Sequence, residues 1–354
     1  SVPVTPSPTA APTASPTPAI LSVQGMVAAT KVGTSCKRSA VVSYWNADWD
    51  KYCIKKTVYM EDNGLSSSDA SADFKFRVLD DAGNPSSLDF QAGVPVVLTL
   101  VNPQVGSNAH HYFTAPEFFK NVAWRKVETD DAEYKAPWFD AVEVMHSSVR
   151  DQEAELYFVP MKAGTYEVLC DIGASKNPDG SFNHNTGHSH AGMFAEINVS
   201  GDLGVSLDNE VSSNYDMSWG ADPRRSSSNA VWSAPNKSFE ATSSGAIQLV
   251  KNAQGLGMLP GSIELENGKG YWLGVINKTS DEHYFTAPEF FAECLMRKAE
   301  DTQAQIKAPY LNAVELKGLD KWVNLFLVPI TQGNYSAYCE IGVTKNPDGS
   351  HDHP

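Results

Sequence analysis

Histidine, cysteine and methionine side chains that could together bind a transition metal occur at regular landmarks in the middle of this chain. His111 stands in an Asn-x-x-His-Tyr context, Cys170 closes the segment GTYEVLC, and His188 and Met193 lie in the segment GHSHAGMFAEINV. Imidazole, thiolate and thioether groups are ligands of soft and borderline metals. Taken singly, a loop histidine is usually solvated, and a buried cysteine or methionine is usually part of a core. The elements that would position these residues therefore matter.

Those elements occur twice in the sequence. The segment HYFTAPEFF starts at His111 and again at His283, which is 172 positions later. The second copy then loses three residues, after which ELYFVPMKAGTYEVLC, ending at Cys170, matches NLFLVPITQGNYSAYC, ending at Cys339. Beyond the cysteines, CDIGASKNPDGS matches CEIGVTKNPDGS. Such self-similarity predicts two homologous domains.

Composition sets the expected domain boundaries. Residues 71–201 hold the first copy and residues 236–354 the second, with a Ser-, Asn- and Gly-rich linker at 202–235. Residues 1–18 are almost wholly Ser, Thr, Pro, Ala and Val, which indicates an extended stalk. Residues 19–70 match neither copy, so the repeat assigns them no role, although they could add strands.

The pattern within each copy predicts an all-β fold. Tyr166, Val168 and Cys170 alternate with Thr165, Glu167 and Leu169, and residues 94–101 form a β-branched run. DAGNP and NPDG supply the residues that reversals require. Short strands with frequent turns indicate a β-sandwich. One helical turn is expected at residues 115–119, where Pro116 suits a first helical position.

The order of these residues resembles the cupredoxin family of blue copper proteins, in which one early histidine is joined by a late Cys, His and Met on a single loop. The resemblance implies two tandem Greek-key β-sandwich domains, the second lacking its last strand in this chain. It also implies a copper ion bound by His111, Cys170, His188 and Met193. Imidazole suits cupric copper, whereas thiolate and thioether suit cuprous copper, so this set serves an ion that cycles between both.

Neighbouring histidines leave alternatives to two of these ligands. His110 competes with His111, but the repeat keeps only the position of His111. His184 and His190 compete with His188, which the family's spacing across a glycine to the methionine favours. Family members place the cysteine and the second histidine a few residues apart, whereas seventeen residues lie between them here. Gly and Pro in that insertion predict a self-contained excursion whose ends meet.

The second copy carries a partial set of candidate metal ligands, His283 and Cys339. His351 and His353 follow, but no counterpart of GHSHAGMFAEINV is present. A truncated chain is one explanation. The other is an open sheet edge completed by a strand of another molecule, such as residues 19–30, linking molecules head to tail. Cys294 replaces Val122 of the first copy and is expected in the core.

The resemblance implies electron transfer rather than an enzyme. Multicopper oxidases and copper nitrite reductases contain cupredoxin repeats, but a histidine next to the cysteine connects their blue copper site electronically to a second copper centre. Leu169 and Asp171 flank Cys170, and Tyr338 and Glu340 flank Cys339. A mononuclear carrier of single electrons is therefore predicted. The alternative is a copper-binding or structural surface protein built from the same modules without redox turnover.

Composition bounds the compartment and the partners. The chain starts at Ser1 with a stalk-like stretch, so we expect a processed protein that is secreted, periplasmic or displayed on the cell surface. An oxidising compartment would permit a disulfide between Cys36 and Cys53. The longest apolar run is too short for a membrane span. A net charge of -15 disfavours nucleic acid and anionic membranes as partners. The acidity indicates either a surface that only maintains solubility or a redox protein partner with a basic surface.

Overall fold

The structure, a computed structural model, describes residues 53–201 and 246–339, apart from 66–68, 70–71, 106, 137–138, 178–181, 253–254, 269, 309–310 and 330. The predicted stalk and linker lie outside the described residues, as do Cys36, His351 and His353. The predicted disulfide to Cys53 therefore stays a prediction. Among the described residues, no helix reaches the length and hydropathy that a membrane span requires.

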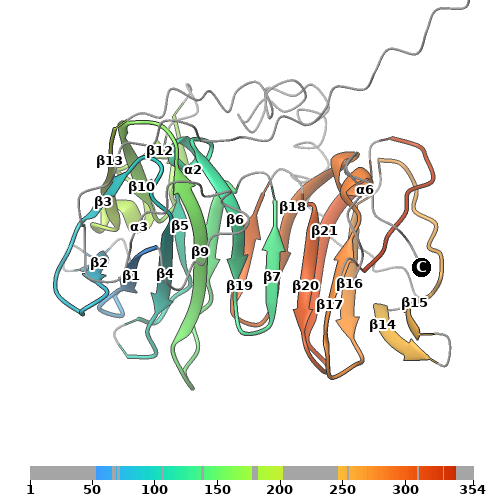
Figure 1. The fold of residues 1–354 in the computed structure, drawn as a ribbon. Coiled ribbons are helices and arrows are strands. Elements are labelled where there is room, and N and C mark those ends of the chain that lie inside the picture. The colour runs from blue at the N-terminus through green and yellow to red at the C-terminus, as the bar shows by residue number, and fades with distance from the viewer. Residues whose placement is uncertain are drawn as a thin grey trace, which may run out of the picture.

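Two large β-sheets form the body of the molecule, and each contains strands of both copies (Figure 1). The eight-stranded sheet runs, in spatial order, β17 (Glu282–Thr286), β20 (Ala313–Lys317), β7 (Ala132–Lys135), β6 (Val122–Glu128), β9 (Gln152–Pro160), β4 (Val96–Asn102), β1 (Ile54–Glu61) and β2 (Lys75–Asp80). The eleven-stranded sheet runs β15 (Gly255–Leu259), β14 (Ile247–Asn252), β16 (Tyr271–Asn277), β21 (Trp322–Pro329), β18 (Cys294–Glu300), β19 (Ala304–Lys307), β8 (Ala141–Val144), β5 (His111–Thr114), β10 (Gly164–Leu169), β13 (Phe194–Ser200) and β3 (Leu88–Gln91). The predicted all-β class is confirmed.

Alternating strands and one aromatic cluster build the core of the first copy. In β9, every second residue from Gln152 to Phe158 is buried, as expected for a strand with one face on a core. Phe158 packs against Trp124, whose indole Nε1 donates a hydrogen bond to the Phe119 carbonyl at 3.0 Å. Phe119 ends the short helix α2 (Pro116–Phe119), which has the predicted proline in its first turn. The second copy repeats this turn as α6 (Pro288–Ala292), and Cys294 lies in its core as expected.

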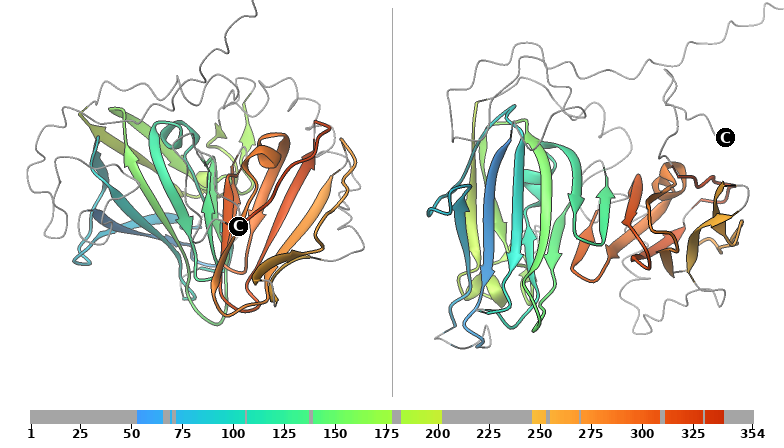
Figure 2. Two further views of the ribbon diagram at one scale, coloured as in Figure 1. Left: turned by 45° about the vertical axis from the view of Figure 1, so that its right-hand side comes forward. Right: turned by 60° about the horizontal axis from the view of Figure 1, so that its bottom comes forward.

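The two copies meet edge to edge, with green strands of the first copy beside orange strands of the second (Figure 2). β7 pairs with β20, and β19 pairs with β8. The repeat offset of 172 relates β7 to β19 and β8 to β20. The β7–β20 and β19–β8 pairings are therefore equivalent to each other, as expected for a local two-fold relation between the copies. Its register agrees, since Ala132 faces Leu316 and Ala304 faces Val144. The sheets therefore continue from one copy into the other instead of closing two separate sandwiches.

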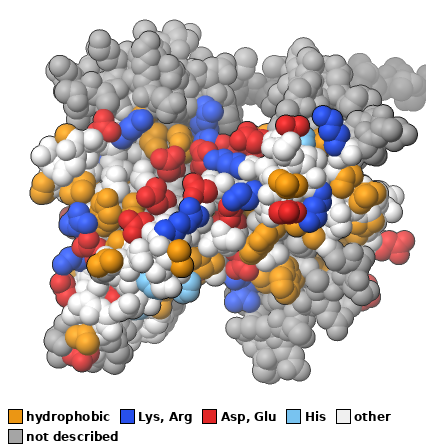
Figure 3. Space-filling view, turned by 90° about the horizontal axis from the view of Figure 1, so that it is seen from below, with side chains coloured by type: hydrophobic (Ala, Val, Ile, Leu, Met, Phe, Trp, Pro, Cys, Tyr) orange, Lys and Arg blue, Asp and Glu red, His pale blue; other side chains and the backbone are white. Residues whose placement is uncertain are grey.

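Buried polar side chains lie along this junction. Thr129 Oγ1 donates to Asp301 Oδ2 at 2.6 Å, and these two residues are separated by the repeat offset of 172. Tyr134 also donates to Asp301, at 2.9 Å. Across the β7–β20 pairing Glu133 faces Glu315, while the equivalent positions of the β19–β8 pairing hold Gln305 and Glu143. On the face seen from below, acidic and basic side chains are interspersed over the described surface (Figure 3).

Part of the segment that matched neither copy belongs to the first sheet. β1 pairs in parallel with β4 and antiparallel with β2, and its Val58 and Met60 are fully buried. In the second copy β14 takes the same place, pairing in parallel with β16. The chain after β1 then passes close to the start of β5, where the first candidate metal ligand lies.

Candidate metal centre

Three strand ends of the first copy bring the candidate ligands together. His111 is the first residue of β5, Cys170 directly follows β10, and Met193 directly precedes β13. Because β10 and β13 pair antiparallel with Leu169 opposite Phe194, Cys170 and Met193 become neighbours. Their backbones are joined by a hydrogen bond from Cys170 N to Met193 O at 3.0 Å. Met193 is completely buried.

The excursion between Cys170 and His188 returns to its starting point, as predicted. Its two short strands, β11 (Ser175–Lys176) and β12 (Phe182–Asn183), pair antiparallel. At its base the His188 N–H donates to the Ile172 carbonyl at 2.9 Å. Gly187 has a φ of +69°, and a Cβ there would lie 2.3 Å from the Ile172 oxygen. Only glycine therefore allows the close approach that starts the short helix α3 (Gly187–His190) and places His188.

His111, Cys170 and His188 form a compact buried cluster. Their ligand atoms all lie within 4.8 Å of one another. Cys170 Sγ is 3.9 Å from His111 Nδ1 and 3.4 Å from His188 Nδ1. His111 and Cys170 are fully buried, whereas His188 is 8% exposed. Phe74 covers the cluster, with its ring centroid 4.5 Å from that of His188 and 5.9 Å from that of His111.

The competing histidines lie apart from this cluster. His184 Nε2 is 2.9 Å from a carboxylate oxygen of Glu167, His190 is exposed, and His110 Nδ1 accepts a hydrogen bond from the backbone of His146 at 3.0 Å. In the second copy, His283 Nδ1 is 3.9 Å from Cys339 Sγ, the same separation as between His111 and Cys170.

Burial disfavours the charged forms of Cys170 and His188 in the absence of a metal. It raises the pKa of the Cys170 thiol to about 12, although backbone N–H groups of Tyr112 and Ile172 oppose this by hydrogen-bonding the sulfur. The Tyr112 N–H donates to Cys170 Sγ at 3.3 Å. Burial, and then the neighbouring His111, lowers the pKa of His188 to about 4. A metal ion binding here would displace the thiol proton, so its affinity would rise with pH.

Asp62 is a buried residue of this site that no sequence pattern indicated. It follows β1, and its carboxylate Oδ2 is 3.0 Å from His111 Nε2. Burial opposes ionisation of Asp62, but hydrogen bonds from His111 and from the backbone of Asn108 and Gly64 lower its pKa well below the usual range. Its carboxylate therefore contacts the ring nitrogen of His111 that faces away from Cys170.

The donor set fits a copper ion. Two imidazole nitrogens and one thiol sulfur converge in the interior, and the buried Met193 lies five residues after His188 in the same loop. A His2Cys set with a weak methionine is typical of blue copper sites. With its two β-sheets and this buried cluster at the strand ends, the fold is cupredoxin-like.

Similar solved structures include reduced rusticyanin, at 18% identity over 41% of this chain and 78% of that chain, with a TM-score of 0.23. Lac15 from a marine microbial metagenome is 15% identical over 80% of this chain, with a TM-score of 0.26, and a multicopper oxidase from Campylobacter jejuni, a metallo-oxidase, is 12% identical over 82%, with a TM-score of 0.23. This chain covers 61% of the length of each of these two proteins. No family model and no curated protein matches the chain.

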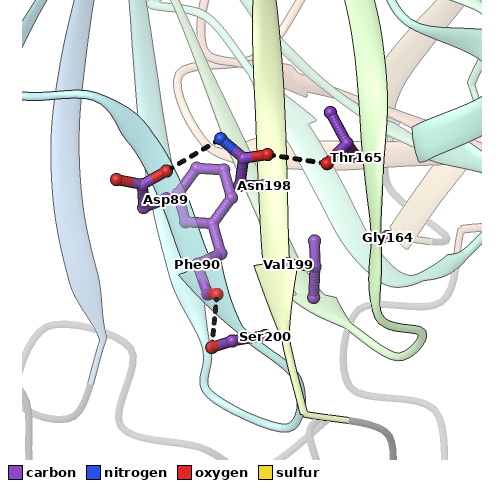
Figure 4. Close-up of a pocket in the computed structure, with 7 residues that line it drawn as sticks. All are labelled: Asp89, Phe90, Gly164, Thr165, Asn198, Val199 and Ser200. Carbon is purple, nitrogen blue, oxygen red and sulfur yellow. Dashed lines mark hydrogen bonds between the residues drawn. The ribbon is translucent and has the colours of Figure 1, made fainter.

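A surface pocket lies away from the metal centre (Figure 4). Asn198 crosses it, donating to Asp89 at 3.1 Å and accepting from Thr165 at 2.9 Å. Gly164, the first residue of β10, lines the pocket, whereas Cys170 follows the last residue of that strand. Six residue steps of about 3.3 Å separate the two by roughly 20 Å. The pocket is therefore not part of the metal centre.

Proposed function

We propose that this protein carries single electrons through a mononuclear copper ion held by His111, Cys170, His188 and Met193. The observation that supports it most directly is the convergence of two imidazole nitrogens and one thiol sulfur, buried and within 4.8 Å of one another. When bound, copper supplies a one-electron couple between its cupric and cuprous forms. Neither flank of Cys170 carries a histidine that would connect a second centre.

The surrounding residues suit a site that changes little as an electron passes. The ligand-bearing segments are joined by backbone hydrogen bonds, from Cys170 to Met193 and from Met193 to His188. Phe74 packs against both histidine rings. Ligands held by such contacts need little rearrangement between oxidation states. His188 is the cluster residue that reaches the surface, so electrons would enter and leave through its ring edge.

The remaining features of the function are part of the same proposal. We expect the protein to work outside the cytoplasm, with a redox protein as its partner. The net charge of -15 favours a basic surface on that partner. Storage or structural use of the copper is the competing function, and it predicts metal binding without reversible redox chemistry.

Colour and voltammetry test the proposal together. Adding cupric ion to the purified protein should give an intense visible absorption from the thiolate and one reversible one-electron wave. Cys170→Ser should lose the absorption while keeping the fold, because the sandwich core does not depend on the thiol. Cys294→Ser is the matched control, since Cys294 is also buried but lies in the core of the second copy. Copper binding without colour or a reversible wave would favour storage and overturn electron transfer.

A further inference from the structure

Asp62 is held by four donors in a closed pocket beside the metal centre. Its side chain is 1% exposed. One carboxylate oxygen accepts the Gly64 N–H at 2.6 Å. The other is 3.0 Å from His111 Nε2 and accepts from Ser107 Oγ at 3.1 Å and from the Asn108 N–H at 3.0 Å. None of these donors belongs to a lysine or arginine, so the negative charge is directed at the imidazole.

This arrangement fixes the state of His111. The Asp62 oxygen nearest to His111 Nε2 already accepts hydrogen bonds from Ser107 Oγ and the Asn108 N–H, so it meets the ring as an acceptor. His111 Nε2 is then the nitrogen that carries the proton and donates it to Asp62. In this tautomer the lone pair lies on Nδ1, the nitrogen that is 3.9 Å from Cys170 Sγ. A carboxylate bound to the far nitrogen of a ligating histidine orients the ring and raises its basicity. More basic nitrogen ligands and a nearby negative charge favour the cupric over the cuprous ion.

The second copy provides a natural contrast at the same position. Asn102 and Asn277 are counterparts, because their side-chain amides donate to the carbonyls of Val144 and Leu316, which the repeat offset relates. Met60 of β1 lies opposite Asn102, by extension of the β1–β4 pairing, and Leu249 of β14 lies opposite Asn277. Lys251 therefore stands where the first copy has Asp62. Lys251 adds to the effect of burial in lowering the pKa of His283. Within the described residues, the buried His283 Nε2 has no hydrogen-bond partner. In the part of the chain that the structure describes, a carboxylate hydrogen-bonded to the ring nitrogen that faces away from the cysteine is therefore found at His111 and not at His283.

We propose that Asp62 is a positioning residue that holds His111 in its Nε2–H tautomer and lowers the reduction potential of the copper bound beside it. The second half of this proposal rests on the proposed function, because it needs copper in the site. The first half concerns the metal-free protein and stands independently.

The tautomer is measured without any metal. Long-range proton–nitrogen correlation spectra of the full metal-free chain should show His111 as a single Nε2–H tautomer, with a slowly exchanging proton. Asp62→Ala should convert this signal into a mixture of tautomers with a fast-exchanging proton. A wild-type His111 protonated on Nδ1 would overturn the positioning role, whether or not the protein takes up copper.

The potential is measured on the copper-loaded protein. Asp62→Asn keeps the size of the side chain and removes its charge, and it remains informative if Asp62→Ala does not fold. We expect cupric affinity to fall about 10- to 100-fold. For each tenfold loss that the cuprous form does not share, the potential rises by about 59 mV. Asp73→Asn is the control, because Asp73 adjoins Phe74 but is exposed.

The outcomes separate this inference from the proposed function. A blue, reversible wild type whose potential is the same in Asp62→Asn and Asp73→Asn would overturn the effect of Asp62 and leave electron transfer standing. A wild type that stays colourless with copper would overturn electron transfer and the potential effect together, and the metal-free spectra would still decide the tautomer.

Discussion

Replacing Glu315 with glutamine should change how the stability of the protein depends on pH. Glu315 faces Glu133 across the β20–β7 pairing, and both residues are less than a tenth exposed. Like charges directly opposite each other on paired strands are destabilising. Burial, together with the hydrogen bond to Glu133, raises the pKa of Glu315 to about 8. Burial opposes ionisation of Glu133 too, but hydrogen bonds from Glu315 and Lys126 lower its pKa below the usual range.

The sign and size of the effect follow from where the proton is held. In the unfolded chain a glutamate has a pKa of about 4.3. Below this pH both states keep the proton, and above about pH 8 neither does. Between these limits the folded protein keeps a proton that the unfolded chain releases, so the free energy of unfolding falls by up to about 1.4 kcal/mol per pH unit. Between pH 5 and 7 the loss is about 2–3 kcal/mol.

Urea unfolding of the metal-free chain from pH 5 to pH 9 measures this slope. Glu315→Gln removes the titrating group and should flatten the decline, matching the wild type near pH 5 and exceeding it above pH 7. An amide is compatible with such a crossing, since Gln305, the counterpart of Glu133, already faces Glu143, the counterpart of Glu315. Glu282→Gln, on the exposed start of β17, is the control. If the wild type and Glu315→Gln lose stability in parallel, the two carboxyls do not share a proton.

Two further substitutions test the metal centre. Met193→Leu should keep the copper and raise its reduction potential, because a weak axial donor favours the cupric form; an unchanged potential in voltammetry would exclude Met193 as a ligand. Gly187→Ala should weaken copper binding in a titration, because a Cβ there meets the Ile172 carbonyl at 2.3 Å and moves His188. Gly83→Ala has a similar positive φ with open space around it, so it should bind copper like the wild type, and equal losses in both would remove His188 placement as the cause.

The sequence was most informative where the chemistry lies on one continuous stretch. The strand that closes on Cys170, the glycine before Met193 and the turn residues of the long excursion are local signals, and the structure brings Cys170 together with His111 and His188. The repeat also carried the all-β fold class, because each copy shows the same period-two pattern.

Local sequence signals could not predict the contact of Asp62 with His111 or the pairing of strands between the two copies. Asp62 belongs to a segment that matches neither copy, and its contact with His111 spans 49 positions. The pairing of β7 with β20 depends on which sheet edges meet. An edge strand and a central strand can have the same alternating sequence pattern, so the pattern does not reveal this pairing. Glu133 and Glu315 are ordinary surface residues in a pattern and become buried only when those edges join.

The hydrogen bond between Thr129 and Asp301 shows what fusing two copies into one polypeptide permits. These positions are each other's counterparts, so in a homodimer of a single-copy ancestor they would face themselves, as threonine against threonine or aspartate against aspartate. Two identical subunits cannot place a hydroxyl donor on one side of their symmetry axis and a carboxylate at the same position on the other side. A duplicated chain can, because the two equivalent positions are encoded by separate codons and can mutate independently.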